Sequence, residues 1–216
     1  MKYYCNPVNI NYRYQFNADQ RKNGIAVCRE AADPSMITFK GRYYIFASMT
    51  LGVWVSDDLV KWENHKLPSE LPLYDYAPDV RVMGEYVYFC ASKKGEKCDR
   101  YRTKDILNGP YEKIEGTFDF WDPNLFVDDD GKAYHIYSSE DNLTLQIAEL
   151  ADDYLSHTGK YIRIFPGGHN EAPAIFKKEG TYWMITSGCT GWDPNKARLL
   201  TADSMLGEWK QLPNPC

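Results

Sequence analysis

Three carboxylic acids stand at related positions of the chain, each close to a proline. Asp33 and Asp122 directly precede a proline, and Glu171 lies two residues before one. Crowded like charges raise the pKa of at least one carboxyl group. Inverting hydrolysis of a glycoside needs one carboxylate as general base on water and one carboxylic acid for the leaving oxygen, ~6.5–9.5 Å apart, and a third carboxylate can keep the pKa of the acid high. The residue types therefore suit acid–base hydrolysis of a glycosidic bond.

The acids belong to a repeated segment. Four stretches read as residue-Pro, apolar strand, glycine turn, aromatic-rich strand and Ser, namely residues 33–48, 77–92, 122–138 and 172–187. Their prolines are 44, 45 and 50 positions apart. An isolated Asp-Pro dipeptide is common in turns, but two such dipeptides in register favour a shared site over a local turn.

Each repeat contains a predicted β-hairpin followed by two weaker strands. The hairpin turns are expected at Lys40-Gly41, Met83-Gly84, Asp130-Gly131 and Glu179-Gly180, where glycine suits a tight turn. A period of about 40–50 residues with four strands per unit is typical of a β-propeller. The sequence therefore predicts an all-β propeller in a single domain, 1–216, with blades at about 30–66, 75–115, 119–165 and 169–212.

The first strand of a propeller blade lines the central channel, so the starts of these strands face one cavity. We therefore expect Asp33, Asp122 and Glu171 to converge. The sequence leaves two blade counts open. Either the ring closes with the four visible blades, or a fifth blade is absent and two blade faces are bare, at ~25 cal/mol for each Å² of apolar surface left in water.

Aromatic and polar residues next to the acids are candidate sugar contacts. Sugars are bound by aromatic faces together with hydrogen-bonding side chains, and the candidates are Tyr76, Trp121, His169, Asn170 and Trp192. Packing between blades is an equally good interpretation of each aromatic residue, and His169 could instead serve as a partner of Glu171. Packing is the expected role of Trp54, Trp62 and Trp209.

Composition argues against several other functions. The 216 residues include 25 Lys and Arg against 30 Asp and Glu, a net charge of −5, with no basic run, so neither a nucleic acid nor an anionic membrane is an expected partner. No apolar stretch reaches the ~18 residues of a membrane span, and the first residues lack a signal-peptide core, which predicts a cytoplasmic protein. Motifs of P-loop, Rossmann, zincin and serine-hydrolase sites are absent from the sequence.

The sequence also predicts no cofactor and no metal-ligand motif, and it leaves open a structural cation in the channel. Six cysteines lack zinc-site spacing, which favours free or buried thiols, with a bridge between Cys189 and Cys216 as the alternative. The segment Asp128–Gly131 lacks the alternating ligands and distal Glu of a calcium loop, so we expect a solvated hairpin there.

Four motifs carry a resemblance to glycoside hydrolase family 43. REAADPSMI contains Asp33, YAPDV stands in the second repeat, WDPNLFVDDDGKAY contains Asp122 and NEAPAIF contains Glu171. The likeness runs from about residue 6 to residue 216. Members are five-bladed propellers that remove xylose, arabinose or galactose units from plant cell-wall glycans with inversion. The resemblance therefore implies an exo-acting glycosidase with an oligosaccharide substrate and no cofactor.

By this resemblance Asp33 is the general base, Asp122 tunes the pKa of the acid and orients it, and Glu171 is the general acid. The chain through about Lys132 is similar to β-xylosidase and α-L-arabinofuranosidase-like members, whereas the remainder is similar to the branch associated with β-1,3-galactan. The family's fifth blade contributes substrate contacts and sometimes a channel His that binds a metal ion; it has no counterpart here, which implies a missing blade. A non-catalytic carbohydrate-binding propeller or an inactive fragment is therefore the alternative function.

Overall fold

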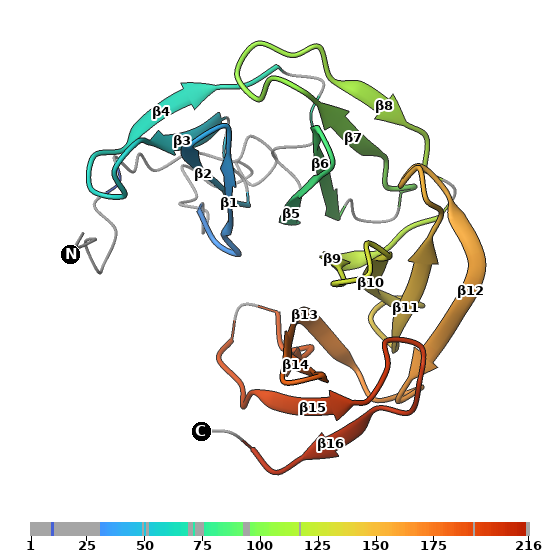
Figure 1. Ribbon diagram of the computed structural model, residues 1–216. Helices are drawn as coiled ribbons and strands as arrows, with labels where there is room; N and C mark the ends of the chain where they lie inside the picture. The colour runs from blue at the N-terminus through green and yellow to red at the C-terminus, as the bar shows by residue number, and fades with distance from the viewer. Residues whose placement is uncertain are drawn as a thin grey trace. The chain divides into compact units, whose positions relative to one another are not determined.

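The computed structural model describes residue 10 and residues 31–214, with gaps at 49, 51, 69–70, 72–75, 93–95, 117 and 192. All regular structure in these residues is β-strand, in four antiparallel sheets of four strands that pair in sequence order. The predicted fold class, all-β with four four-stranded blades, is thereby confirmed, and Figure 1 labels the strands of each blade. In the described part of the chain, no helix is long and apolar enough to span a membrane.

The chain divides into two compact units, which are described separately: residues 1–91 with 100–113, and residues 92–99 with 114–216. The first two sheets contain β1 (Ser35–Phe39), β2 (Arg42–Phe46), β3 (Gly52–Ser56), β4 (Glu63–Lys66), β5 (Tyr76–Met83), β6 (Tyr86–Ser92), β7 (Arg100–Thr103) and β8 (Glu112–Ile114). The other two contain β9 (Trp121–Val127), β10 (Ala133–Ser139), β11 (Thr144–Leu150), β12 (His157–Ile164), β13 (Asn170–Lys178), β14 (Thr181–Gly188), β15 (Arg198–Ala202) and β16 (Lys210–Leu212).

Two predicted hairpins close with two-residue turns in which both residues have positive φ. The angles are 48° and 77° at Lys40 and Gly41, and 52° and 80° at Glu179 and Gly180. This is the conformation of a type I′ turn, whose twist matches that of the strands on either side. The turns set the registers of β1 with β2 and of β13 with β14.

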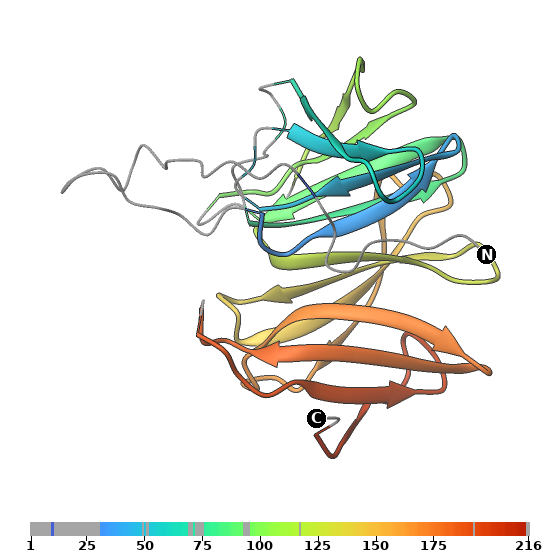
Figure 2. The same ribbon diagram turned by 90° about the vertical axis from the view of Figure 1, so that its left-hand side faces the viewer.

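In the second unit, a hydrophobic core lies between the sheets β9–β12 and β13–β16. Ile136 and Ile147 of the first sheet and Met184 and Leu200 of the second are all 0% exposed, and they belong to one cluster. Figure 2 shows these two sheets face to face. The core of the first unit joins β1–β3 to β5–β7 in the same way, around side chains such as Phe46 and Phe89. Trp54, Trp62 and Trp209 are buried, as expected of packing residues.

The opposite face of β13–β16 carries exposed apolar side chains. Phe176 is 45% and Ile185 41% exposed. The rings of Phe176 and Trp183 lie nearly parallel, 10° apart in plane, with their centres separated by 6.4 Å. These side chains form an exposed apolar patch on this face of the sheet.

The residue before each repeat proline has the same unusual backbone conformation in all four copies. The φ angles are 50° at Asp33, 49° at Ala77, 46° at Asp122 and 52° at Ala172. Positive φ in a residue other than glycine costs on the order of 1–3 kcal/mol and persists only where its surroundings enforce it. The conformational repeat therefore extends to single residues, and it coincides with two of the predicted acids.

An extra residue at this point forms a β-bulge in two blades. Three steps along β9 from Trp121 to Asn124 oppose two steps along β10, and three steps along β13 from Glu171 to Ala174 oppose two along β14. A bulge bends its strand and changes the direction of nearby side chains. Both bulges lie at the start of a first strand, where the acids are.

Asp128 differs from the sequence expectation of a solvated hairpin. Its side chain is only 7% exposed and forms an ion pair with Lys177 at 2.7 Å. It also accepts a hydrogen bond from the hydroxyl of Tyr182. Burial alone would raise the pKa of Asp128, but the bonds from Lys177 and Tyr182 lower it overall. Asp128 thus links the sheets β9–β12 and β13–β16, whereas its neighbour Asp129 is 84% exposed.

We predict that Asp128→Ala lowers the free energy of unfolding by about 1–3 kcal/mol at pH 7, because it removes the acceptor of the buried Tyr182 hydroxyl and the closer of the two carboxylates paired with Lys177. Urea unfolding measures the change, with Asp129→Ala as the control, expected to cost less than about 1 kcal/mol. A carboxyl group with a lowered pKa stabilises the fold above its unfolded pKa. The difference should therefore shrink as the pH falls below about 4; equal losses in the two variants would contradict the prediction.

Candidate active site

The second unit brings Asp122 and Glu171 together. Asp122 begins the bulge of β9 and Glu171 precedes the bulge of β13. The Oδ2 atom of Asp122 accepts a hydrogen bond of 3.2 Å from the backbone N–H of Ala172, the residue after Glu171. Both acids are half-buried. The bulges therefore place two of the three predicted acids on adjacent strand starts.

Asp33 belongs to the first unit. Its side chain is exposed, and its Oδ2 atom accepts a hydrogen bond of 2.8 Å from the hydroxyl of Ser48. Ser48 Oγ in turn accepts the backbone N–H of Ala77 at 2.7 Å. The carboxylate is thus oriented by a serine two residues after β2 of its own repeat, and its other oxygen can serve as an acceptor.

Cys189, which the sequence analysis considered only as a free thiol or a partner of Cys216, lies close to the two acids. It is a free thiol directly after β14. Its pKa is raised to about 12, first by burial and then by the negative charges of Glu171 and Asp122, with Arg198 opposing the shift. Both carboxylates therefore lie close enough to Cys189 to raise its pKa. Because the thiol stays protonated, it adds no negative charge to the pair.

Asn142 is a site residue that sequence reasoning missed. Its Nδ2 atom donates to Glu171 Oε2 at 3.3 Å, and its backbone oxygen accepts from the thiol of Cys189 at 3.6 Å. Its Oδ1 atom is buried and has no hydrogen-bond partner among the described residues. No repeat pattern marks Asn142, since it lies in a turn of its own between β10 and β11.

Arg198 supplies a positive charge that acts on Cys189. Its Nη1 atom donates to the backbone oxygens of Gly168 and His169 at 2.8 and 3.0 Å, and to Asn170 Oδ1 at 2.5 Å. A Cβ atom at Gly188 would stand 3.3 Å from Arg198 Nη2, so glycine there leaves room for the guanidinium. The arginine is therefore held mainly by neutral oxygens.

The predicted sugar contacts have different surroundings. His169 is exposed, with φ at 50°, and lies within two residues of Glu171. Asn170 is 2% exposed, and its side-chain oxygen accepts hydrogen bonds from Thr186 and Arg198. Its amide is therefore buried and has a structural role. Trp121 is half-buried. The side chain of Tyr76 and the whole of Trp192 lie outside the described residues, as does Cys216.

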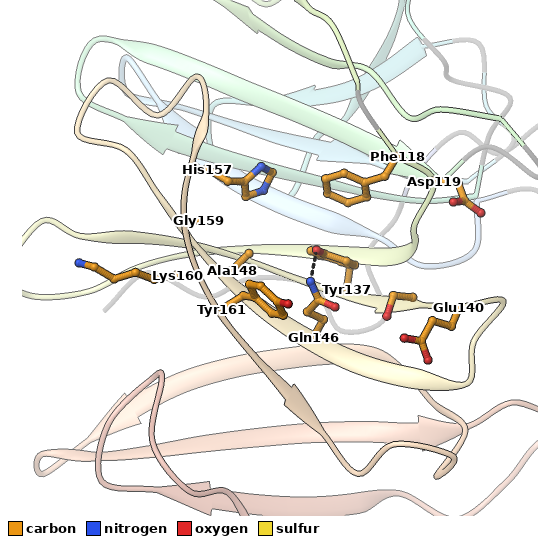
Figure 3. A pocket seen from close by; sticks show the side chains of 11 residues that line it. Phe118, Asp119, Tyr137, Glu140, Gln146, Ala148, His157, Gly159, Lys160 and Tyr161 are labelled. Atoms are coloured by element: carbon orange, nitrogen blue, oxygen red, sulfur yellow. Dashed lines mark hydrogen bonds between the residues drawn. The ribbon is translucent and has the colours of Figure 1, made fainter.

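A separate cavity of about 440 Å³ lies on the sheet β9–β12 (Figure 3). Its lining residues are Phe118, Asp119, Tyr137, Ser139, Glu140, Gln146, Ala148, His157, Gly159, Lys160 and Tyr161. Inside it, Gln146 donates a hydrogen bond of 2.7 Å to the hydroxyl of Tyr137. The hydrogen bond from Thr144 and the charge of Arg163 lower the pKa of Glu140, which does not suit a general acid. The cavity contains none of the predicted catalytic residues.

Metal ligands do not cluster in the described ranges: no group of three or more His, Cys, Asp or Glu side chains there could hold an ion.

The structure thus has four four-stranded blades, two of which carry a carboxylate, Asp122 or Glu171, at the bulge of the first strand. Residues 25–216 match the family model of glycosyl hydrolases family 43. The chain belongs to that family, and the resemblance seen in the sequence is confirmed.

Similar proteins of this family act on galactosides. A solved family 43 β-1,3-galactosidase in complex with galactodeoxynojirimycin is 40% identical, covers 94% of this chain and 80% of its own, and has a TM-score of 0.75. An exo-β-1,3-galactanase from Clostridium thermocellum is 27% identical over 85% of this chain and 48% of its own, with a TM-score of 0.72. A β-D-galactofuranosidase of Aspergillus niger is 26% identical over 84% of this chain. The chain spans 64% of that curated relative.

We predict that iodoacetamide alkylates Cys189 in the native protein at pH 8 about 1,000-fold more slowly than an ordinary free cysteine, because a pKa of about 12 leaves almost no thiolate. Peptide mass spectrometry over time gives the rate. Glu171→Gln removes a charge that raises this pKa and should speed the reaction, while Glu179→Gln, in the exposed β13–β14 turn, serves as the control. Alkylation of Cys189 at the rate of a free thiol would contradict its burial, and equal rates in wild type and Glu171→Gln would contradict the effect of the Glu171 charge.

Proposed function

We propose that this chain is the catalytic propeller of an inverting exo-glycosidase that releases terminal galactose from β-1,3-linked galactose chains. The observation that carries the proposal is the hydrogen bond from Ala172 N–H to Asp122, which joins the strand starts bearing Asp122 and Glu171. Membership of family 43 supports the reaction class. The 40% identity to a β-1,3-galactosidase supports galactose over xylose and arabinose, the other sugars that the sequence leaves open.

The three acids take different roles in this proposal. Glu171 donates a proton to the glycosidic oxygen as that bond breaks, and Asp33 takes a proton from the water that attacks the opposite face of the sugar. Asp122 stays ionised, and its negative charge favours the protonated form of the nearby acid. The reaction consumes one water and needs no cofactor.

Neighbouring residues would bind and orient the sugar. The buried Oδ1 atom of Asn142 is an acceptor that a substrate hydroxyl can satisfy. His169 is exposed beside Glu171 and can bond a second hydroxyl. Trp121 offers an aromatic face next to Asp122.

We expect the protein to release galactose from β-1,3-galactotriose and to cleave nitrophenyl β-galactoside in preference to the β-xyloside and the α-arabinofuranoside. Proton NMR of the first product should show the α-anomer, since inversion changes the configuration of a β-linkage. Xylose or arabinose release alone would contradict the choice of sugar, and β-galactose as first product would contradict inversion.

Glu171→Gln should lower kcat on β-1,3-galactotriose by about 100- to 10,000-fold, the usual contribution of a general acid, with binding retained. Calorimetry measures binding, and product analysis measures turnover. Glu179→Gln, an exposed Glu to Gln change in the same sheet, should behave as wild type. Full activity in Glu171→Gln would remove Glu171 from the mechanism, and sugar binding by wild type without any product would favour the non-catalytic alternative.

A further inference from the structure

The turn between β10 and β11 has a strained backbone. Glu140, Asp141 and Asn142 have φ angles of 57°, 55° and 64°. None of the three is glycine, and a left-handed conformation crowds the Cβ of an L-residue against the carbonyl that follows. Single residues adopt it routinely, but three in succession do not. Such strain persists where surrounding contacts over-determine the conformation, and it clusters at functional sites.

The first end of the turn is fixed by Glu140. Arg163 Nη2 lies 2.6 and 2.8 Å from the two oxygens of its carboxylate, and Thr144 Oγ1 donates to it at 2.9 Å. The N–H of Leu143 donates back to Ser139 at 3.1 Å. These bonds define where the turn starts and how tightly it closes.

The other end of the turn meets Glu171. Asn142 Nδ2 donates to Glu171 Oε2 at 3.3 Å, and the thiol of Cys189 holds the Asn142 carbonyl at 3.6 Å. The carbonyl of Leu143 accepts the N–H of His169 at 3.3 Å. A strained turn anchored on β12 through Arg163 thus ends on the side chain that would be the general acid.

We propose that Asn142 is a positioning residue for Glu171 and that the Glu140–Asn142 turn is the device that holds it in place. The inference rests on the proposed function only in naming Glu171 the acid. An amide N–H bonded to Oε2 uses that oxygen as an acceptor, so the acidic proton resides on Oε1. When Oε1 transfers its proton to the glycosidic oxygen, the new carboxylate keeps the bond from Asn142, and water later returns the proton.

The first test is direct titration of Glu171 by NMR, with the side-chain carboxyl carbons of all glutamates labelled and the signal assigned by its loss in Glu171→Gln. Asn142→Gly is the informative variant, because glycine tolerates positive φ and removes the donor without adding strain. We expect it to be as stable as wild type in urea or more so, with Glu171 titrating at higher pH because a donor to the charged form has been removed. Asp152→Ala, in the exposed β11–β12 turn, is the control and should leave the titration unchanged.

The second test is the pH dependence of kcat on β-1,3-galactotriose. A general acid loses activity as the pH rises through its pKa, so the alkaline limb should move to higher pH in Asn142→Gly, with kcat lowered about 10- to 100-fold. Glu140→Gln, which weakens the pair with Arg163 and leaves Asn142 in place, should move the limb in the same direction by less.

The two tests separate this inference from the proposed function. A Glu171 titration that is identical in wild type and Asn142→Gly overturns the positioning role, whether or not the protein is active. A shifted titration in a protein that cleaves none of the glycosides supports the positioning role and contradicts the glycosidase. Reduced kcat with an unmoved alkaline limb would assign Asn142 to substrate binding alone and would overturn its action through Glu171.

Discussion

In three repeats the backbone N–H of the residue before the proline donates to a side chain of the preceding repeat. The arrangement of the acids depends on these hydrogen bonds. In the first unit, Ala77 N–H donates to the hydroxyl of Ser48 at 2.7 Å. In the second unit, Asp122 N–H donates to Ser92 in the same way, at 2.7 Å. Each donor belongs to a residue before proline with positive φ. The bond offsets part of a conformational cost of about 1–3 kcal/mol at each position.

The fourth repeat departs from this pattern in an informative way. The N–H of Ala172 donates to the carboxylate of Asp122 instead of to a serine, while Ser138 donates to the backbone oxygen of Asn170. A carboxylate accepting a backbone N–H is held more firmly in its ionised form than one in water. Asp122 therefore carries part of the connection between these two blades.

The repeat is readable from the sequence because it depends on local patterns. Glycine turns such as Lys40-Gly41, and strands rich in β-branched and aromatic residues, predict the hairpins, and the spacing of the prolines predicts the blades. The contacts of Asn142, Cys189 and Asp128 are not readable in this way. They join positions 29, 47 and 49 residues apart, they do not recur in other repeats, and they depend on how two particular blades meet. Nothing in the charge pattern separates Asp128 from its exposed neighbour.

The thiol of Cys189 lies beside the two acids without adding a charge to them. A lysine in its place would put a positive charge beside the two carboxylates and lower their pKa values. A thiol with a pKa of about 12 stays neutral, fills the space and still donates a hydrogen bond to the Asn142 carbonyl. The nearby arginine, Arg198, has its Nη1 atom bonded to two backbone oxygens and an amide oxygen. The charges of Asp122 and Glu171 are therefore not offset by Cys189, which lies beside these two acids as a neutral thiol.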